Sequence, residues 1–415
     1  MAQQPGQGAA PAACRVCGGE VTQFLDLGWQ PISQRFRAPD DPTEEFRFRL
    51  SAGQCRACTL VQLLEEVPRE LMFRADYPFT SSGSTVMTEH FTDVAKQLIH
   101  TELTCPDPFM VEIGSNDGVM LRSMADAGVR HLGFEPSAAV ASMARAAGVR
   151  VVDEFFEEAS ARAVAATEGP ADVVYSANTI CHIPYLDSIF RGLEVLLAPT
   201  GVFIFEDPYL GDVVDKTAFD QIYDEHFYLF SARSVRALAL RYGFDLVDVR
   251  RLPVHGGEVR YTLARAGART PTPAVASLLA EEDARALADP ATLDRFARAT
   301  ADIRPALVAT LSELRRAGRR VVGYGATAKS ATLLNYCGIG PDLLPFICDT
   351  TASKQGLLTP GMRIPVRPPE AFADPYPDYA LLLAWNHAEE IMAKEVDFSR
   401  HGGRWLRSVP EVHVV

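Results

Sequence analysis

The chain has 415 residues, of which 47% are hydrophobic and 22% are charged, and its mean hydropathy is 0.00. This composition is typical of a globular protein, and the length predicts two or three domains because it exceeds what one core usually holds. The net charge of −13 argues against a nucleic-acid partner, which needs a basic surface, and no run of about 18 apolar residues indicates a membrane-spanning helix.

Residues 1–13 carry neither the basic start nor the apolar stretch of a signal peptide. We therefore expect a short disordered leader on a cytoplasmic protein without a membrane partner. The eight cysteines then indicate reduced thiols or metal ligands rather than disulfides.

Four of these cysteines form two C-x-x-C pairs, Cys14 with Cys17 and Cys55 with Cys58. Two such pairs, each in a knuckle-like turn, can bring four thiolates onto one tetrahedral zinc ion. The gap of about 37 residues between the pairs is longer than usual for a zinc ribbon, but a few strands fit inside it. Because four ligands leave no open position for water, the predicted site is structural and contributes to the folding of a small domain. Two unrelated turns or a redox pair are the alternative.

The next segment alternates predicted strands and helices. Residues 109–118 form an apolar strand that enters a glycine-rich turn, and a helix begins at Val119. This alternation predicts a parallel, doubly wound sheet whose ligands bind beyond the carboxyl ends of the strands. The further strands are predicted at 131–135, 149–152, 171–177 and 201–206.

The glycine-rich turn indicates which nucleotide such a sheet binds. A dinucleotide and S-adenosylmethionine both place an acidic residue after the second strand, where it accepts hydrogen bonds from ribose hydroxyls, and Glu135 has this position. The dinucleotide fingerprint G-x-G-x-x-G is absent, because the turn reads Gly114-Ser-Asn-Asp-Gly118. This form favours S-adenosylmethionine, which has no pyrophosphate to hold. An NAD-linked oxidoreductase remains the main alternative.

The last third of the chain repeats this plan. Residues 265–319 have helical periodicity and predict connecting helices, and a strand from Arg320 then enters a Gly-x-Gly-Ala turn and a helix with Lys329. Backbone N–H groups at a helix N-terminus, with a lysine one turn in, can hold a diphosphate. A purely structural domain is the alternative. Two later strands are predicted at 346–349 and 379–384.

Residues 221–230, QIYDEHFYLF, place carboxylates and a histidine among aromatic residues. In an extended segment, Tyr223 and Glu225 point one way while Asp224 and His226 point the other. The cluster indicates an acid–base site, and a half-buried strand with satisfied polar groups is the alternative.

Taken together, these motifs resemble the S-adenosylmethionine-dependent C-methyltransferases that act on nucleotide-linked 4-keto deoxysugars in antibiotic pathways. The nearest resemblance is to the enzyme that methylates C-3′ of a dTDP-3-amino-4-keto-trideoxy sugar on the tetronitrose route. The motifs that carry it are the two C-x-x-C pairs, 77–84 with Met87 and His90, 112–118, 178–184, 223–226, 255–257, 323–329 and 354–356.

The resemblance implies an α/β monomer with three domains. These are a zinc-binding domain at 1–75, a class I methyltransferase Rossmann-like domain at 76–265, and a second Rossmann-like domain at 266–415 that anchors the sugar nucleotide. The implied donor-binding residues are Glu112, Gly114, Asn116, Glu135, Asp153, Phe155 and Asn178, and the implied sugar-nucleotide residues are Tyr324, Lys329, Asp349 and Lys354.

The chemistry of the family requires a carbon beside a ketone to lose its proton and become an enolate. We predict His226 as the general base, because an imidazole titrates nearest to working pH. His182 is the candidate donor to the enolate oxygen or the rival base, and Tyr223 and Tyr77 are further donors. Glu225 would bind the 3-amino group or fix His182.

The resemblance leaves two alternatives for the substrate. The substrate can be another nucleotide-linked 4-keto sugar, without the amino group or methylated at C-5. A noncatalytic zinc-knuckle binding protein is the alternative from another class.

Overall fold

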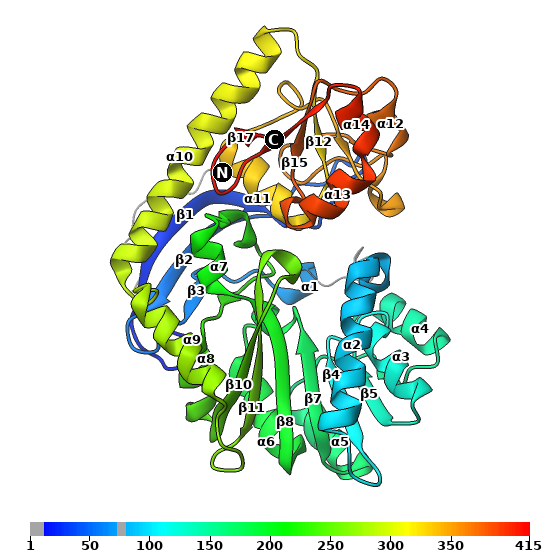
Figure 1. Cartoon of the computed structure of the whole chain (residues 1–415), viewed down its shortest axis with the longest axis vertical. Helices are drawn as coiled ribbons and strands as arrows, with labels where there is room; N and C mark the ends of the chain where they lie inside the picture. Colours follow the sequence, from blue (N-terminus) through cyan, green and yellow to red (C-terminus); the bar gives the residue numbers. More distant parts are fainter. Residues whose placement is uncertain (1–11, 73–79) are drawn as a thin grey trace.

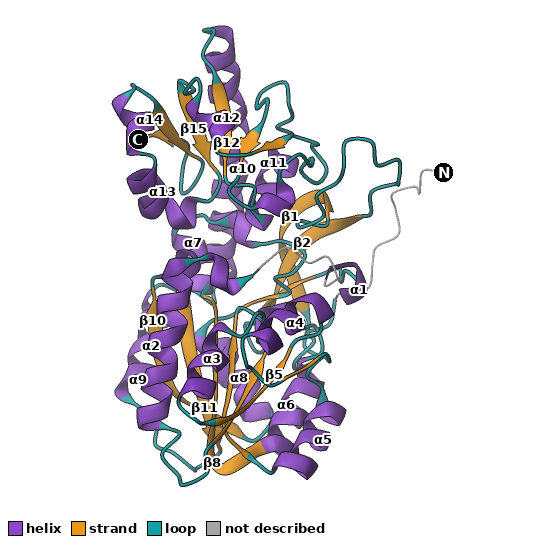
Figure 2. Cartoon of the chain, turned by 90° about the vertical axis from the view of Figure 1, so that its right-hand side faces the viewer, coloured by secondary structure: helices purple, strands orange, loops and turns teal. Residues whose placement is uncertain are grey.

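The computed structural model describes residues 12–72 and 80–415. Most of the predicted leader and the candidate donor Tyr77 lie outside these residues. The described chain contains three sheets, and the C-terminal sheet lies above the middle sheet with the N-terminal sheet to one side of both (Figures 1 and 2).

The N-terminal sheet is antiparallel, in the order β1-β2-β3-β9. Its first strands fill the gap between the two C-x-x-C pairs, as predicted, and β2 ends on Cys55. The last strand comes from far along the chain and lies directly after the Tyr-Asp-Glu-His cluster. The strands are β1 (Val21–Pro31), β2 (Arg47–Cys55), β3 (Val61–Leu63) and β9 (Tyr228–Leu229).

The middle sheet has seven strands in the order β10-β11-β8-β7-β4-β5-β6. Five are parallel, with the first strand in the centre, and β11 runs antiparallel to both of its neighbours. This is the doubly wound order that the sequence predicted. The strands are β4 (Phe109–Ile113), β5 (Arg130–Phe134), β6 (Val151–Val152), β7 (Ala171–Ala177), β8 (Leu197–Pro208), β10 (Phe244–Leu252) and β11 (Glu258–Arg265).

Helices cover both faces of the middle sheet because neighbouring strand residues point to opposite sides. Met110 packs with α2, α3 and α4 in one buried cluster, whereas Val111 packs with α5, α6 and α8 in another. The helices of this part are α1 (Arg69–Met72), α2 (Thr85–Thr101), α3 (Val119–Asp126), α4 (Ala138–Ala146), α5 (Glu158–Glu168), α6 (Leu186–Leu196), α7 (Leu210–Asp215) and α8 (Ala232–Arg241).

The C-terminal sheet repeats the central first strand, in the order β14-β13-β12-β15-β16-β17. All pairs are parallel except β16 with β17. The strands are β12 (Val321–Tyr324), β13 (Ile347–Cys348), β14 (Val366–Arg367), β15 (Tyr379–Leu382), β16 (Arg404–Arg407) and β17 (His413–Val414), and the helices are α11 (Ala328–Cys337), α12 (Glu370–Ala373), α13 (Ala388–Lys394) and α14 (Val396–Arg400).

The predicted connecting helices are present as α9 (Pro273–Ala284) and α10 (Pro290–Arg316). The long α10 packs against β1 and α11, so it joins the N-terminal and C-terminal sheets (Figure 1). One buried apolar cluster runs through all three sheets and includes Val61, Phe203 and Leu381. The three parts therefore share a continuous core.

Residues 221–230 are not extended throughout, so the side-chain directions expected for an extended segment do not apply to the cluster. Residues 223–225 form a turn, closed by the bond from the His226 N–H to the Tyr223 carbonyl (3.0 Å), and only Tyr228–Leu229 is strand. A run of apolar and aromatic residues looks the same in a buried turn as in a strand, because both bury every side chain. Tyr223 and His226 consequently lie together instead of on opposite faces.

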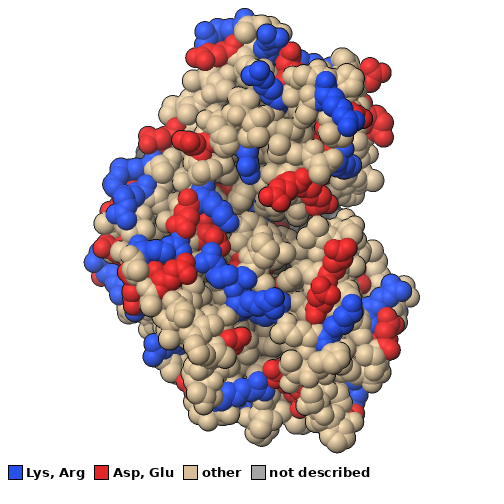
Figure 3. Space-filling model, viewed as in Figure 1, with Lys and Arg blue, Asp and Glu red and all other residues tan. Residues whose placement is uncertain are grey.

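In the part of the chain that the structure describes, no helix has both the length and the apolar character to cross a membrane. On the face shown in Figure 3, Lys and Arg residues alternate with Asp and Glu, and the surface is notched between the C-terminal and middle parts.

Candidate active site

A cavity of about 490 Å³ lies between the middle and C-terminal sheets. Gly114 and Asn178 line it from the carboxyl ends of β4 and β7, and Gly325 and Ala384 line it from those of β12 and β15. Doubly wound sheets bind their ligands at these positions. The described residues predicted as catalytic all line this cavity, namely His182, Tyr223, Glu225 and His226.

The glycine turn after β4 has the shape of a ligand cradle. Gly114 has φ +73°, and a Cβ at this position would lie 2.3 Å from Oγ1 of Thr179, so only glycine fits. The Glu135 carboxylate accepts hydrogen bonds from the N–H groups of Asn116 (3.0 Å) and Ser137 (2.8 Å). Burial raises the pKa of Glu135, and these two bonds oppose the rise. Each oxygen keeps a lone pair that can still accept a ribose hydroxyl.

The 77–84 motif covers this turn with its described residues. The Ser81 N–H donates to Oδ1 of Asn116 (2.9 Å), and the Ser82 N–H donates to Oδ2 of Asp117 (3.2 Å). Ser84 then caps α2 by accepting from the Met87 N–H (3.3 Å). The motif thus closes one side of the cradle.

Of the remaining residues predicted to bind the methyl donor, some line the cavity and others do not. Phe155 and Asn178 line the cavity, but Asp153 forms an ion pair with Arg145 and does not line it. Glu112 also does not line it, because it is buried inside β4, where burial raises its pKa well above the usual range. The neighbouring Glu154 lines the cavity in place of Asp153.

Tyr223, His226 and Gln221 form a hydrogen-bonded chain. Nδ1 of His226 lies 2.7 Å from the Gln221 carbonyl oxygen, and Nε2 lies 2.7 Å from the Tyr223 hydroxyl. Since a carbonyl oxygen can only accept, Nδ1 carries the ring proton. Nε2 of the neutral ring is therefore the acceptor, and the Tyr223 hydroxyl donates to it.

Both cavity histidines near this chain are held neutral. The rings of His182 and His226 have centroids 5.1 Å apart. Burial lowers the pKa of His182 to about 3, and burial followed by the proximity of His182 and Lys329 lowers the pKa of His226 well below its usual range. The Nε2 lone pair of neutral His226 accepts from the Tyr223 hydroxyl, so the pair can take up a proton that reaches the tyrosine oxygen.

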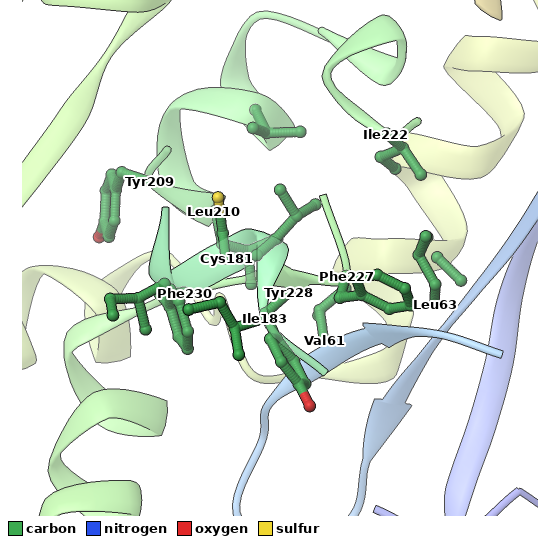
Figure 4. Packing of buried hydrophobic residues seen from close by; sticks show 14 of the residues in the cluster. Val61, Leu63, Cys181, Ile183, Tyr209, Leu210, Ile222, Phe227, Tyr228 and Phe230 are labelled. Carbon is green, nitrogen blue, oxygen red and sulfur yellow. The ribbon is translucent and has the colours of Figure 1, made fainter. Parts of the chain in front are cut away.

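Packing on several sides fixes the segment that carries His226. Phe227 and Tyr228 lie between β3 and the segment around Cys181 and Ile183 (Figure 4), and the Leu63 N–H donates to the Phe227 carbonyl (2.9 Å). Asp224 accepts from the N–H of Ser33 (3.0 Å) and does not line the cavity, so its role is structural.

The C-terminal wall carries the four residues predicted to hold the sugar nucleotide, and all of them line the cavity. Three have protein partners: Tyr324 donates to Glu395 (2.7 Å), Asp349 accepts from the Ala326 N–H (2.6 Å), and Lys354 donates to the Ala326 carbonyl (2.9 Å). Lys329 lies at the start of α11, and burial lowers its pKa while Asp220, Glu258 and Glu225 oppose the shift.

The structure adds lining residues that the sequence did not predict as site residues. His387, Glu390 and Lys394 come from α13 and the turn before it, and no motif marks them. His255 lines the cavity with φ +50°, a strained conformation for a residue other than glycine. The His255-Gly-Gly motif was a signal for it.

The four N-terminal cysteines fit a zinc ion. Their sulfur atoms lie within 4.8 Å of one another, with Cys14 and Cys58 3.5 Å apart and Cys17 and Cys55 3.4 Å apart. The Cys55 sulfur also accepts from the N–H groups of Ala57 (3.4 Å) and Cys58 (3.5 Å). Four sulfurs at these separations, with backbone N–H groups on one of them, suit a closed tetrahedral site.

Known proteins match nearly the whole chain. Three family models match successive segments: a zinc binding domain at 14–73, a methyltransferase domain at 87–249 and a C-methyltransferase C-terminal domain at 253–410. The chain is 35% identical over 405 residues to the C-methyltransferase NovU of Streptomyces niveus, and the match covers 97% of this chain and 96% of the relative.

Two solved structures resemble part of the chain. Magnesium protoporphyrin IX methyltransferase of Synechocystis PCC 6803, with bound S-adenosylmethionine, has 13% identity and a TM-score of 0.33 and covers 43% of this chain and 79% of its own. The CcbJ methyltransferase of Streptomyces caelestis has 14% identity and a TM-score of 0.33 and covers 43% of this chain and 90% of its own.

The family models and the relative NovU decide against the NAD-linked oxidoreductase and the noncatalytic zinc-knuckle protein. The methyl donor is S-adenosylmethionine, and zinc binds in the N-terminal domain. With a relative this similar along nearly its whole length, the chain belongs to the S-adenosylmethionine-dependent C-methyltransferases.

Proposed function

We propose that the protein transfers a methyl group to C-3′ of a dTDP-linked 3-amino-4-keto-trideoxyhexose in deoxysugar biosynthesis. The observation that carries this proposal is the neutral Tyr223–His226 pair in the same cavity as the donor cradle. The alternative sugars, without the amino group or methylated at C-5, need the same acid–base chemistry and differ in the groups that contact the ring.

The first step removes the proton on the carbon beside the ketone. We propose that His226 is the final proton acceptor and that Tyr223 transmits the proton. As the C–H bond breaks, the carbon keeps the electron pair and the proton joins the Tyr223 oxygen, while the original Tyr223 proton moves to Nε2 of His226. The Gln221 carbonyl accepts from Nδ1 and supports the imidazolium that forms.

The enolate oxygen needs a hydrogen-bond donor. His182 is neutral and close to His226, so its ring N–H can supply this bond. Glu225 lines the same wall and would attract the 3-amino group. Tyr77 keeps its predicted role as a further donor.

The donor site is built from the cradle after β4. Gly114 allows close approach, Glu135 would accept the ribose hydroxyls, and Phe155 and Asn178 would flank the adenine and the amino-acid end. When bound, S-adenosylmethionine supplies an electrophilic methyl group to the nucleophilic carbon. Asn116 orients Ser81 and so shapes the same cradle.

The C-terminal wall would hold the nucleotide. Lys329, at the N-terminal end of α11, offers a positive charge to the diphosphate together with the backbone N–H groups of the helix. Tyr324, Asp349 and Lys354 build the turn around it. The expectation of a cytoplasmic monomer without nucleic-acid or membrane partners stays a prediction, as do the domain boundaries at residues 75 and 265.

The test is exchange of the α proton into deuterated water, measured by NMR on dTDP-4-keto sugars with and without the 3-amino group. His226→Asn should abolish exchange and lower methyl transfer by about 10²- to 10⁴-fold, because the proton has no acceptor. Tyr223→Phe should lower exchange as well if the tyrosine transmits the proton. Exchange at the wild-type rate in His226→Asn would reject the role of the histidine.

His401→Asn is the matched control. His401 is exposed, lies outside the cavity and bonds only to the Asp397 carbonyl among its described hydrogen bonds. It should leave both exchange and methyl transfer unchanged. Faster turnover of the sugar without the amino group would favour the alternative substrate.

A further inference from the structure

The catalytic histidine depends on a short segment that precedes it. The His226 ring is oriented by the Gln221 carbonyl, which accepts from Nδ1 (2.7 Å). The position of residues 220–222 therefore sets both the tautomer and the direction of Nε2. This segment is held by contacts from other parts of the chain.

Trp385 makes the first of these contacts. Its indole Nε1–H donates to Oδ2 of Asp220 at 2.7 Å, and both side chains are buried. Trp385 lies after β15, directly behind the cavity-lining Ala384, but Trp385 itself does not line the cavity. The C-terminal sheet thus reaches past the ligand space to the segment behind the base.

Thr332 makes the second contact. Its hydroxyl donates to the Ile222 carbonyl at 3.2 Å, and it lies one turn after Lys329 in α11. Both contacts accordingly come from the elements after β12 and β15, where the C-terminal wall of the cavity is formed. A ligand bound at these elements touches the same rigid units that hold residues 220–222.

A third segment locks Trp385 in place. A Cβ on Gly256 would lie 2.7 Å from the Trp385 ring, so the indole packs directly on the backbone of this turn. The Gln221 side chain donates to the His255 carbonyl at 2.8 Å and ties the same turn to the catalytic segment. The indole is therefore fixed between Gly256 and Asp220.

We propose that Trp385 and Thr332 are positioning residues, through which the C-terminal domain holds residues 220–222 and so aims His226 at the substrate. Binding of the sugar nucleotide on the C-terminal wall then organises the base on the middle domain. This inference rests on the proposed function, in which His226 takes the substrate proton. Neither residue touches the reacting atoms.

The first test compares Trp385→Phe and Thr332→Val with Thr300→Val. Thr300 is fully buried in α10, and its hydroxyl has no hydrogen-bond partner among the described residues, so its variant controls for loss of a buried hydroxyl. Trp385→Phe should lower kcat about 10- to 100-fold, because a small misplacement of the base is expensive, and should change KM for S-adenosylmethionine less than twofold. Thr332→Val should lower kcat about threefold to tenfold, and Thr300→Val should leave it unchanged.

The second test needs no chemistry. In the wild type, dTDP should slow the amide hydrogen exchange of peptides covering 219–227. In Trp385→Phe, the same peptides should exchange at least tenfold faster than in the wild type, and dTDP should no longer slow them. The inference is overturned if this segment exchanges as slowly in Trp385→Phe as in Thr300→Val. It is also overturned if kcat stays within twofold of wild type in both Trp385→Phe and Thr332→Val. If the wild-type protein does not transfer a methyl group to the sugar, the proposed function is rejected. The hydrogen-exchange measurement would still show whether Trp385 holds residues 220–222.

Discussion

The two doubly wound sheets of this chain use the same local structure around different glycine turns. In the middle sheet, Glu135 directly follows the second strand and accepts from the Asn116 and Ser137 N–H groups. In the C-terminal sheet, Asp349 has the same place and accepts from the Ala326 (2.6 Å) and Thr351 (2.7 Å) N–H groups. In both sheets the carboxylate stabilises the glycine turn through backbone hydrogen bonds, independently of the ligand that the turn binds.

The glycines repeat as well. Gly114 has φ +73° and faces Thr179 after β7, and Gly325 has φ +91° and faces Ala384 after β15, where a Cβ would lie 2.6 Å away. In each case the chain leaving the neighbouring parallel strand packs onto the turn after the first. The requirement for glycine is therefore set by packing at the switch point of the sheet and not by the ligand alone.

The two sheets differ in the side chains that they bring to the cavity beside each turn. Around Gly114, the 80–84 motif and His182 supply polar groups and a neutral imidazole. Beyond Gly325, the chain supplies Lys329, and past β15 it supplies His387. In the proposed function, one architecture thus serves chemistry in the middle domain and anchoring of the sugar nucleotide in the C-terminal domain.

Removal of zinc should have the largest effect, because the zinc-bearing N-terminal sheet supports both doubly wound sheets. Structural zinc is worth about 10–16 kcal/mol in zinc-finger peptides, and here the zinc-bearing sheet pairs β3 with β9, directly after His226. A strong chelator should abolish methyl transfer and expose the N-terminal sheet to proteolysis, and added zinc should restore activity. A zinc-free protein with an unchanged Tm and rate would contradict this expectation.

Alanine at each glycine should separate the two turns. Gly114→Ala should weaken the binding of S-adenosylhomocysteine about 10- to 100-fold. An alanine in the left-handed backbone conformation costs about 1–2 kcal/mol, and its Cβ would displace Thr179. Gly325→Ala should weaken dTDP to a similar extent. Calorimetric titration of both ligands checks this.

Each variant is the control for the other. Gly114→Ala should bind dTDP within twofold of wild type, and Gly325→Ala should bind S-adenosylhomocysteine within twofold. If either substitution weakens both ligands equally, the two turns do not serve separate ligands.

Lys329→Met should weaken binding of the nucleotide and leave the methyl-donor site unchanged. Loss of the charge should weaken dTDP binding about 10- to 100-fold, in line with about 1.5–3 kcal/mol for a hydrogen bond to a charged group, while S-adenosylhomocysteine binds as before. Lys96→Met, on the exposed face of α2, is the control and should change neither affinity. An unaltered dTDP affinity would place the diphosphate elsewhere.

The smallest expected effect is on the pH dependence of stability. Unfolded His182 binds a proton below about pH 6.5, whereas the folded residue does so only near pH 3 because of burial. Since the unfolded state binds more protons between these values, the free energy of unfolding rises with pH across this window and is lost as pH falls. His182→Phe should remove up to about 2 kcal/mol of the difference between pH 6.5 and pH 5 in urea unfolding.

His401→Phe, which replaces an exposed histidine in the same way, is the matched control variant. An identical pH dependence in His182→Phe and wild type would show that His182 is not held neutral by the fold.

The local features of this chain could be predicted from short stretches of its residues. The C-x-x-C pairs, both glycine turns, the acidic residues after the second strands and the alternation of strands and helices are read from neighbouring residues. They are correct because φ preferences, hydrophobic periodicity and ligand spacing act over a few positions.

Packing of distant segments sets which side chains share the cavity and which lie behind it. It left Glu112 inside β4, paired Asp153 with Arg145, folded 223–226 into a turn and brought Trp385 against Asp220. Trp385 and Asp220 are far apart in the sequence, so their contact depends on how three sheets pack on one core. Short-range patterns carry no record of that packing.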